Sequence, residues 1–267
     1  MTSSHGQTND PQHAELPHYQ VLLDSTDWAS LETPSGTGAF LPEALARLVD
    51  ADPAVRVAAI ADALGGVTHQ NTIYEATVPV ALYVAAILDH PAAASGDCER
   101  DAEGAGRYPT RAALLEWLSN TAYDADDECV AIGERIWGGG YLDDYSDMRA
   151  FRDLRPALFS AVRPLLSHDD ESVREAALIA AIPLVEHPAL KPNRDELVDH
   201  ARRLLAASSD RYKRDRVLDA LKAWGHDTRA LENPDDRAAR ERYARLKAER
   251  ESRASDWLGG YAKDPPF

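Results

Sequence analysis

Apolar residues recur with helical spacing from Phe40 onward, and short polar breaks separate the apolar segments. This spacing predicts helices that each bury one face against a neighbour. Three of the breaks are alike, because each leads from the end of one apolar helix through an Asp-containing turn into a second helix. They lie in LVDADPAVRVAAIADAL (48–64), LLSHDDESVREAALIAAIPL (165–184) and LLAASSDRYKRDRVLDAL (204–221).

The second helix of each unit carries an anchor residue followed by apolar residues five and nine positions later. The three sets are Val55, Ile60 and Leu64; Val173, Leu178 and Ile182; and Tyr212, Val217 and Leu221. A cation follows each anchor (Arg56, Arg174, Lys213), and YPTRAALLEWL (108–118) is a weaker relative with Arg111 after Thr110. Repeated helix-turn-helix units build α-solenoids, so we predict an all-α solenoid of about four irregular helix pairs.

The same pattern divides the chain into three regions. Residues 1–38 are rich in Ser, Thr, Gly, Pro and His without a sustained period, which predicts a largely disordered arm with a short ordered piece near 19–28. Residues 39–232 form the predicted solenoid. Residues 233–267 contain RAARERYARLKAERESR, whose mixed charges and few large apolar residues predict a solvated C-terminal capping helix and tail.

Charge is distributed unevenly along the chain. Residues 1–150 hold 7 Lys or Arg against 24 Asp or Glu, whereas residues 151–267 hold 22 against 21, and the whole chain has a net charge of −16. An acidic half repels phosphate backbones, so nucleic acid is not expected as its partner; RRLLAASSDRYKRDR (202–216) is the one stretch that we keep as a phosphate contact. The acidity favours attraction to a basic protein surface or a cationic ligand, or it serves solubility alone, and these interpretations stay open.

Cysteine usage and hydropathy bear on the compartment. Cys98 and Cys129 form no CxxC motif, which predicts a reducing compartment rather than a disulfide framework. The stretch MTSSHGQTND shows no secretory signal, and the longest apolar run, Val78–Leu88, is too short for a membrane span. We therefore expect a cytoplasmic protein without membrane association.

Metal and cofactor motifs were sought among the His, Cys and acidic residues. The His and Cys positions lack the spacing of a zinc site. DADDE (124–128) and DDYSD (143–147) do not fit an EF-hand loop, and the first of them predicts a helix start, where carboxylates suit the helix dipole. No metal and no cofactor are therefore expected.

Two polar loops are candidate binding sites. The stretch 65–77 lies between Gly65-Gly66, which predict the end of one helix, and Thr77, which predicts the start of the next. The stretch 137–151, WGGGYLDDYSDMRAF, is either an insertion between repeats or an adaptable loop that grips a basic partner. The candidate residues are His69, Gln70, Tyr74 and Glu75 in the first loop, and Trp137, Tyr141, Asp143, Asp144, Tyr145 and Asp147 in the second.

An Asp-containing turn, a Val-Arg pair and an Ala-rich apolar helix, as in DADPAVRVAAI and DDESVREAALI, resemble HEAT repeats over roughly residues 40 to 232. More narrowly, THQNTIYEATVPVALYVAAIL resembles a stretch of small stand-alone bacterial HEAT-like proteins, some of which occur near toxin systems. The resemblance implies a binding scaffold, because the fold itself carries no chemistry. An immunity or antitoxin-like role is the sharpest form of that implication.

Function is therefore expected to be non-enzymatic binding of a basic protein, with the oligomeric state undetermined. His69, Tyr74 and Glu75 are acid–base types, but no nucleophile motif or phosphate loop accompanies them. One alternative is a DNA-acting enzyme similar to the HEAT-like alkylpurine glycosylases, which needs a basic groove. Another is a regulatory subunit of a larger assembly, which exposed aromatic residues around Trp117, Tyr123 and Trp137 would favour.

Overall fold

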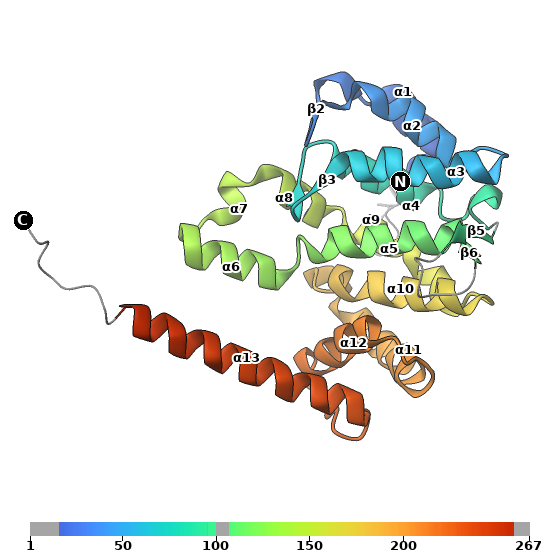
Figure 1. Cartoon of the computed structure of the whole chain (residues 1–267). Coiled ribbons are helices and arrows are strands. Elements are labelled where there is room, and N and C mark those ends of the chain that lie inside the picture. The colour runs from blue at the N-terminus through green and yellow to red at the C-terminus, as the bar shows by residue number, and fades with distance from the viewer. Residues whose placement is uncertain (1–15, 95, 100–106, 259–267) are drawn as a thin grey trace, which may run out of the picture. The chain divides into compact units, whose positions relative to one another are not determined.

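The computed structural model describes residues 16–94, 96–99 and 107–258, and this part of the chain is predominantly helical (Figure 1). The chain divides into two compact units, Met1–Ala201 and Arg202–Phe267. The predicted all-α class is confirmed in its main feature, and three short β-hairpins are added at turns. The stacking of helix pairs into a solenoid stays a prediction.

The elements of the first unit are helices joined by short turns. Its α-helices are α1 (Tyr19–Ser25), α2 (Leu41–Ala46), α3 (Pro53–Ala59), α4 (Thr77–Ala86), α5 (Thr110–Tyr123), α6 (Asp127–Trp137), α7 (Tyr141–Asp144), α8 (Ser146–Asp153), α9 (Arg155–Val162) and α10 (Glu171–Leu184). Its 3₁₀ segments are η2 (Trp28–Ser30), η3 (Gly38–Phe40), η4 (Arg47–Val49), η6 (Gly65–Val67), η7 (Pro91–Ala94), η8 (Arg163–Ser167) and η9 (Pro188–Asn193), and a π-helical segment, η5, covers Ile60–Leu64.

Antiparallel hairpins account for the strands. They pair β1 (Glu32–Thr33) with β2 (Gly36–Thr37), β3 (Thr68–His69) with β4 (Thr72–Ile73), and β5 (Gly96–Glu99) with β6 (Arg107–Pro109). The unit boundary falls within α11 (Arg194–Ala207), and the second unit continues with α12 (Arg211–Ala223) and α13 (Pro234–Leu258). None of the helices in the described ranges combines the length and the apolar character that a membrane crossing requires.

The core of the first unit lies between α5 and α10, which run side by side (Figure 1). Both helices bury small or branched side chains, including Ala112, Leu115, Ala177 and Ala181. Alanine lets the two backbones approach closely, while leucine fills the remaining space. Helix α4 adds a second layer through contacts with α1, α8 and α9.

A capping aspartate and an arginine four residues later recur at the predicted turns. Asp52 accepts a hydrogen bond from the Ala54 amide at 2.9 Å, and Asp170 accepts one from the Ser172 amide at 2.9 Å. Arg56 Nη1 donates to the carbonyls of residues 50 and 51 at 2.6 and 3.0 Å, and Arg174 Nη1 donates to those of residues 168 and 169 at 2.7 and 2.6 Å. The arginine thus supplies donors to carbonyls that the end of the preceding helix leaves unpaired.

In the third predicted helix-turn-helix repeat, residues 204–221, the predicted register was wrong by one residue. Asp210 caps α12 by accepting from the Lys213 amide at 3.2 Å, and Arg214, four residues after the cap, donates to the Ser208 carbonyl at 3.0 Å. Tyr212, the predicted anchor, is 50 % exposed, whereas Lys213 is buried. The spacing of apolar residues in this arginine-rich stretch fits two helix registers, and only the contacts in the structure distinguish them.

The region boundaries expected from composition differ from those of the structure. Within the predicted arm, residues 1–15 lie outside the described residues, while 16–38 contain α1 and the β1–β2 hairpin, and Trp28 is buried. Trp28 Nε1 donates to the Leu23 carbonyl at 3.0 Å, so this indole closes the turn after α1. The compact units divide at residue 201 rather than 232. The expected C-terminal helix is present as α13, of which Tyr243 and Leu246 are exposed.

Candidate functional site

The two candidate loops meet through one tyrosine. The Tyr145 hydroxyl accepts a hydrogen bond from the Ile73 amide at 2.8 Å and donates one to the Ile73 carbonyl at 2.8 Å. These residues are 72 positions apart in the sequence. In Figure 1 the β3 turn lies beside α8, as the contacts between β4 and α8 require. The stretches 65–77 and 137–151 therefore form one region of the first unit.

Hairpin geometry explains why Ile73 is open to Tyr145. Gln70 and Asn71 have φ of 49° and 59°, so both central residues of the two-residue turn are left-handed, as in a type I′ turn. His69 pairs with Thr72, and Thr68 pairs with Ile73. Because hydrogen-bonded pairs alternate along an antiparallel ladder, the peptide groups of Ile73 point away from β3. Tyr145 supplies both of the partners that this buried residue would otherwise lack.

A third segment, which the sequence interpretation missed, joins this region through Glu75. Glu75 Oε2 accepts a hydrogen bond from the Glu32 amide at 2.9 Å, and the Ala76 amide donates to the Glu32 carbonyl at 3.1 Å. The β1–β2 hairpin is thereby held against the start of α4. Glu32 carried no local signal, since it is an isolated acid in a Gly- and Ser-rich stretch.

Negative charge is concentrated where these segments meet. The pKa of the Asp147 carboxyl is raised, first by burial and then by Glu75 and Glu32, with the Ser146 hydroxyl acting in the opposite direction. Like charges raise a carboxyl pKa only when they are close, so three acids from three segments share one surface. Burial also raises the pKa of Tyr145 to about 12, against the effect of the Ile73 backbone bond, and the neutral hydroxyl can therefore donate.

Exposed apolar side chains lie on α6, which is followed in the chain by α7 and then by α8, the helix that carries Asp147. Ile132, Ile136 and Trp137 are 39 %, 66 % and 78 % exposed. The helix ends at Gly138, whose φ of 96° favours glycine, and the chain turns back through Gly140 at φ 93° into α7. Isoleucines four residues apart on one helix share a face, and Trp137 is the last residue of the same helix.

Tyr141 holds α7 against α6. Its ring occupies the space beside Gly133, where an added Cβ would lie 2.4 Å from the nearest ring atom. It also meets the Tyr145 ring edge-on, with centroids 5.8 Å apart. Gly133 is therefore the residue that allows Tyr141 to pack, and the Tyr141–Tyr145 ring pair connects α7 with the turn before α8.

The remaining candidates divide into paired and exposed groups. Asp143 forms an ion pair with Arg149 at 2.6 Å, which compensates its charge, whereas Asp144 is exposed. His69 and Gln70 form the exposed tip of the β3–β4 hairpin, and Tyr74 is half-buried with its amide bonded to Thr77 Oγ1 at 3.0 Å. As predicted, Asp126–Glu128 begin a helix, because Asp126 caps α6 through the Cys129 amide at 2.7 Å.

No group of three or more His, Cys, Asp or Glu side chains in the described part of the chain is arranged to hold a metal ion. Glu75 and Tyr145, two residues of acid–base type, are engaged in backbone hydrogen bonds that hold the segments together.

No protein-family model, no curated protein and no solved structure matches this chain. Function therefore has to be inferred from the chain's own residues.

Removing the Tyr145 hydroxyl tests whether its two hydrogen bonds hold the β3–β4 hairpin in place. Tyr145→Phe removes one donor and one acceptor and leaves the buried amide and carbonyl of Ile73 without their partner. We expect a cost of about 1–3 kcal/mol, localised to the β3–β4 hairpin. Hydrogen exchange at the Ile73 amide measures it, with Tyr141→Phe as the control that keeps the packed ring. Equal exchange in both variants would contradict the contact.

Proposed function

We propose that the chain is a non-enzymatic binding protein that holds a basic protein partner. The binding region is the acidic-aromatic surface, defined here as Glu32, Tyr74, Glu75, Trp137, Tyr141, Asp144 and Asp147 together with Ile132 and Ile136. The observation that carries the proposal is the convergence of three distant segments: Glu75 accepts from the Glu32 amide at 2.9 Å, and Tyr145, two residues before Asp147, bonds to the Ile73 backbone at 2.8 Å. Glu32 and Glu75 also act, after burial, to raise the pKa of the Asp147 carboxyl. A lysine or arginine of a partner would relieve this repulsion.

The exposed apolar residues of α6 add a hydrophobic contribution to binding, which charge alone does not provide. Large apolar side chains left in water are a cost that binding can recover, and tryptophan is enriched among the residues that dominate interface energies. Trp137 is the most exposed of the large apolar side chains in the described residues. A basic segment with an apolar face, such as an amphipathic helix, would match both features.

An immunity or antitoxin-like role is the sharpest form of this proposal. A protein with a net charge of −16 can mask the basic surface through which many proteins bind nucleic acid or membranes. Support comes from charge and from the acidic-aromatic surface.

The proposal is tested by capture with the full chain in lysate from its own cells, followed by measurement of binding with each purified partner. Trp137→Ala is expected to weaken binding by about thirtyfold, as for an interface hot spot, and Asp144→Lys is expected to slow association at low salt. The matched control combines Val21→Ala and Asp24→Lys on α1, where an apolar and an acidic residue are likewise exposed.

A partner that binds all variants equally, or whose binding is insensitive to salt, would contradict the acidic-aromatic surface as the binding site. Retention of nucleic acid instead of protein would overturn the proposed class. For a partner that arrests growth when produced alone, co-production of the chain should restore growth and the Trp137→Ala/Asp144→Lys double variant should not. Growth arrest that persists with the unaltered chain would exclude immunity while leaving the binding proposal in place.

A further inference from the structure

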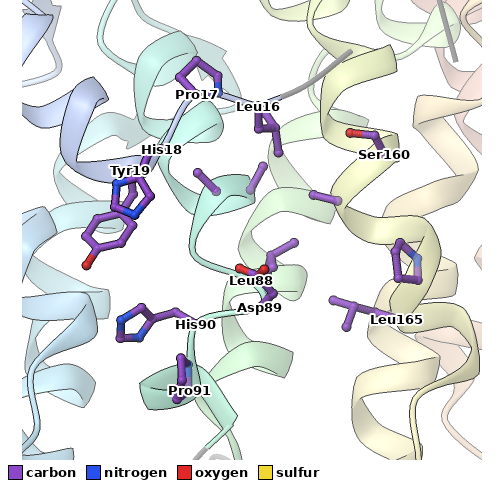
Figure 2. Close-up of a pocket in the computed structure, with 14 residues that line it drawn as sticks. Leu16, Pro17, His18, Tyr19, Leu88, Asp89, His90, Pro91, Ser160 and Leu165 are labelled. Atoms are coloured by element: carbon purple, nitrogen blue, oxygen red, sulfur yellow. The ribbon is translucent and has the colours of Figure 1, made fainter. Parts of the chain in front are cut away.

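A groove of about 680 Å³ lies in the first unit, apart from the acidic-aromatic surface (Figure 2). Three segments line it: residues 16–19 before and at the start of α1, residues 85–91 at the end of α4, and residues 160–165 of α9 and η8. None of the residues that define the acidic-aromatic surface lines the groove. Its volume is in the range of sites that hold small organic molecules.

Most of the lining is apolar. Leu88, Ala85 and Leu165 are buried, and Leu16 and Ala161 are half-buried. Proline rings at positions 17, 91 and 164 add rigid apolar surface from all three segments. A ligand with a hydrocarbon or aromatic body would exclude water from these walls.

One carboxylate stands within the apolar lining. In Figure 2 Asp89 lies between the rings of His18, Tyr19 and His90 on one side and Ser160 and Leu165 on the other, and this residue is exposed to solvent in the groove. The rings are in contact, since the Tyr19 centroid is 4.5 Å from that of His18 and 5.6 Å from that of His90. A carboxylate beside π-faces is a combination that binds organic ammonium groups.

The lining contains no lysine or arginine. His18 Nδ1 accepts from the Gln20 amide at 3.3 Å and His90 Nδ1 accepts from the Ala92 amide at 3.2 Å, so these backbone bonds fix the orientation of both rings. Residues 85 and 86 belong to the last turn of α4, whose dipole places partial negative charge there. Arg111, which lies outside the lining, offsets part of the negative charge of Asp89. Asp89 acts to raise the pKa of Arg111, whereas burial has the larger effect and lowers that pKa.

We propose that this groove binds a small organic cation, an amine carried on an apolar or aromatic body. The ammonium group would donate to the Asp89 carboxylate and lie against the Tyr19 and His90 rings. The body would lie along Leu16, Leu88 and Leu165. This site is independent of the acidic-aromatic surface, so either proposal can fail without the other.

The test uses the full chain with phenethylamine as the probe and 2-phenylethanol as its uncharged counterpart, both measured by calorimetry and by NMR of the imidazole protons. We expect saturable binding of the amine that perturbs His18 and His90, and binding at least about tenfold weaker for the alcohol. Asp89→Asn should weaken amine binding by about tenfold or more, whereas Asp144→Asn, an exposed carboxylate outside the groove, should leave it unchanged.

Ala161→Phe provides a second variant that leaves the charge intact and fills the groove. It should abolish the imidazole perturbation while the circular dichroism of the chain stays unchanged. Equal amine binding by the unaltered chain and Asp89→Asn, equal binding of amine and alcohol, or no saturable binding of the amine would each overturn the proposal. Binding of a lysine-containing peptide through Asp89 without binding of the free amine would assign the groove to a protein partner instead.

Discussion

Replacing Arg214 by methionine is expected to lower the free energy of unfolding of the second unit by about 3–5 kcal/mol, because it leaves a buried carboxylate without its cation. The Arg214 and Asp236 side chains are 3 % and 4 % exposed, and Nη2 lies 2.6 Å from Oδ2. Arg214 also donates to the carbonyls of Ser208 at 3.0 Å and Leu231 at 3.1 Å, so one side chain joins α12, the turn before it and the start of α13.

Hydrogen exchange of the α12 amides measures this loss within the second unit alone. Arg229→Met is the matched control, because Arg229 and Asp227 form a bidentate pair that is largely exposed, and exposed pairs contribute little to stability. An Arg214→Met/Asp236→Leu double variant should recover part of the loss, since it removes the stranded charge. Similar protection in Arg214→Met and Arg229→Met would contradict the role given to the buried pair.

The pH dependence of stability in the first unit is expected to depend on Glu186. Burial raises its pKa from 4.5 to about 7, with Arg155 opposing the shift and Asp127 and Asp126 adding to it. Glu186 lies 3.2 Å from the buried Arg155 and accepts from the Asp127 amide at 2.9 Å, so it connects the end of α10 with the starts of α6 and α9. Because burial raises its pKa to about 7, the Glu186 carboxyl takes up its proton near neutral pH in the folded chain.

The direction of the pH dependence of stability follows from the raised pKa of Glu186. The folded state holds this proton up to about pH 7, whereas the unfolded chain releases it near its ordinary value, so the group's contribution is greatest at low pH and is lost as pH rises from about 4.5 through 7. The shift corresponds to about 3 kcal/mol over this window. Urea unfolding at several pH values, followed by circular dichroism, should show this slope in the unaltered chain and a flatter one in Glu186→Gln.

A second variant separates the pKa shift from a general effect of substitution at Glu186. Asp127→Asn removes a carboxylate that raises the pKa of Glu186, so the midpoint of the pH dependence should move to lower pH. Carbon-detected NMR titration of the Glu186 carboxyl measures the midpoint directly. An identical pH slope in the unaltered chain and in Glu186→Gln would contradict the prediction.

Local signals determined most of the helices. Asp52, Asp170 and Asp210 were recognisable as turn residues because a capping carboxylate and the amides that it accepts from lie within three residues of each other. The helix start at Asp127 followed from the same kind of signal. Thr77 was wrong as a cap, because Ala76 holds the N-cap position of α4 and the Thr77 hydroxyl instead donates to the Val67 carbonyl at 2.9 Å. The short hairpins were missed because strands of two to four residues carry too little alternation to be detected, and Gln70-Asn71 is not a strong turn pair.

The sequence by itself determined the helical class, the acidic character and the residue types available for recognition. Only the tertiary structure decided that Tyr145 would bond to Ile73, that Glu32 would join Glu75 and Asp147, and that Asp89 would face residues 16–19 across a groove. Helix caps and turns depend on neighbours a few residues away, which the sequence displays. Contacts across 43 or 72 residues depend instead on how whole helices pack, and any of several acids or tyrosines would have fitted the local pattern equally well.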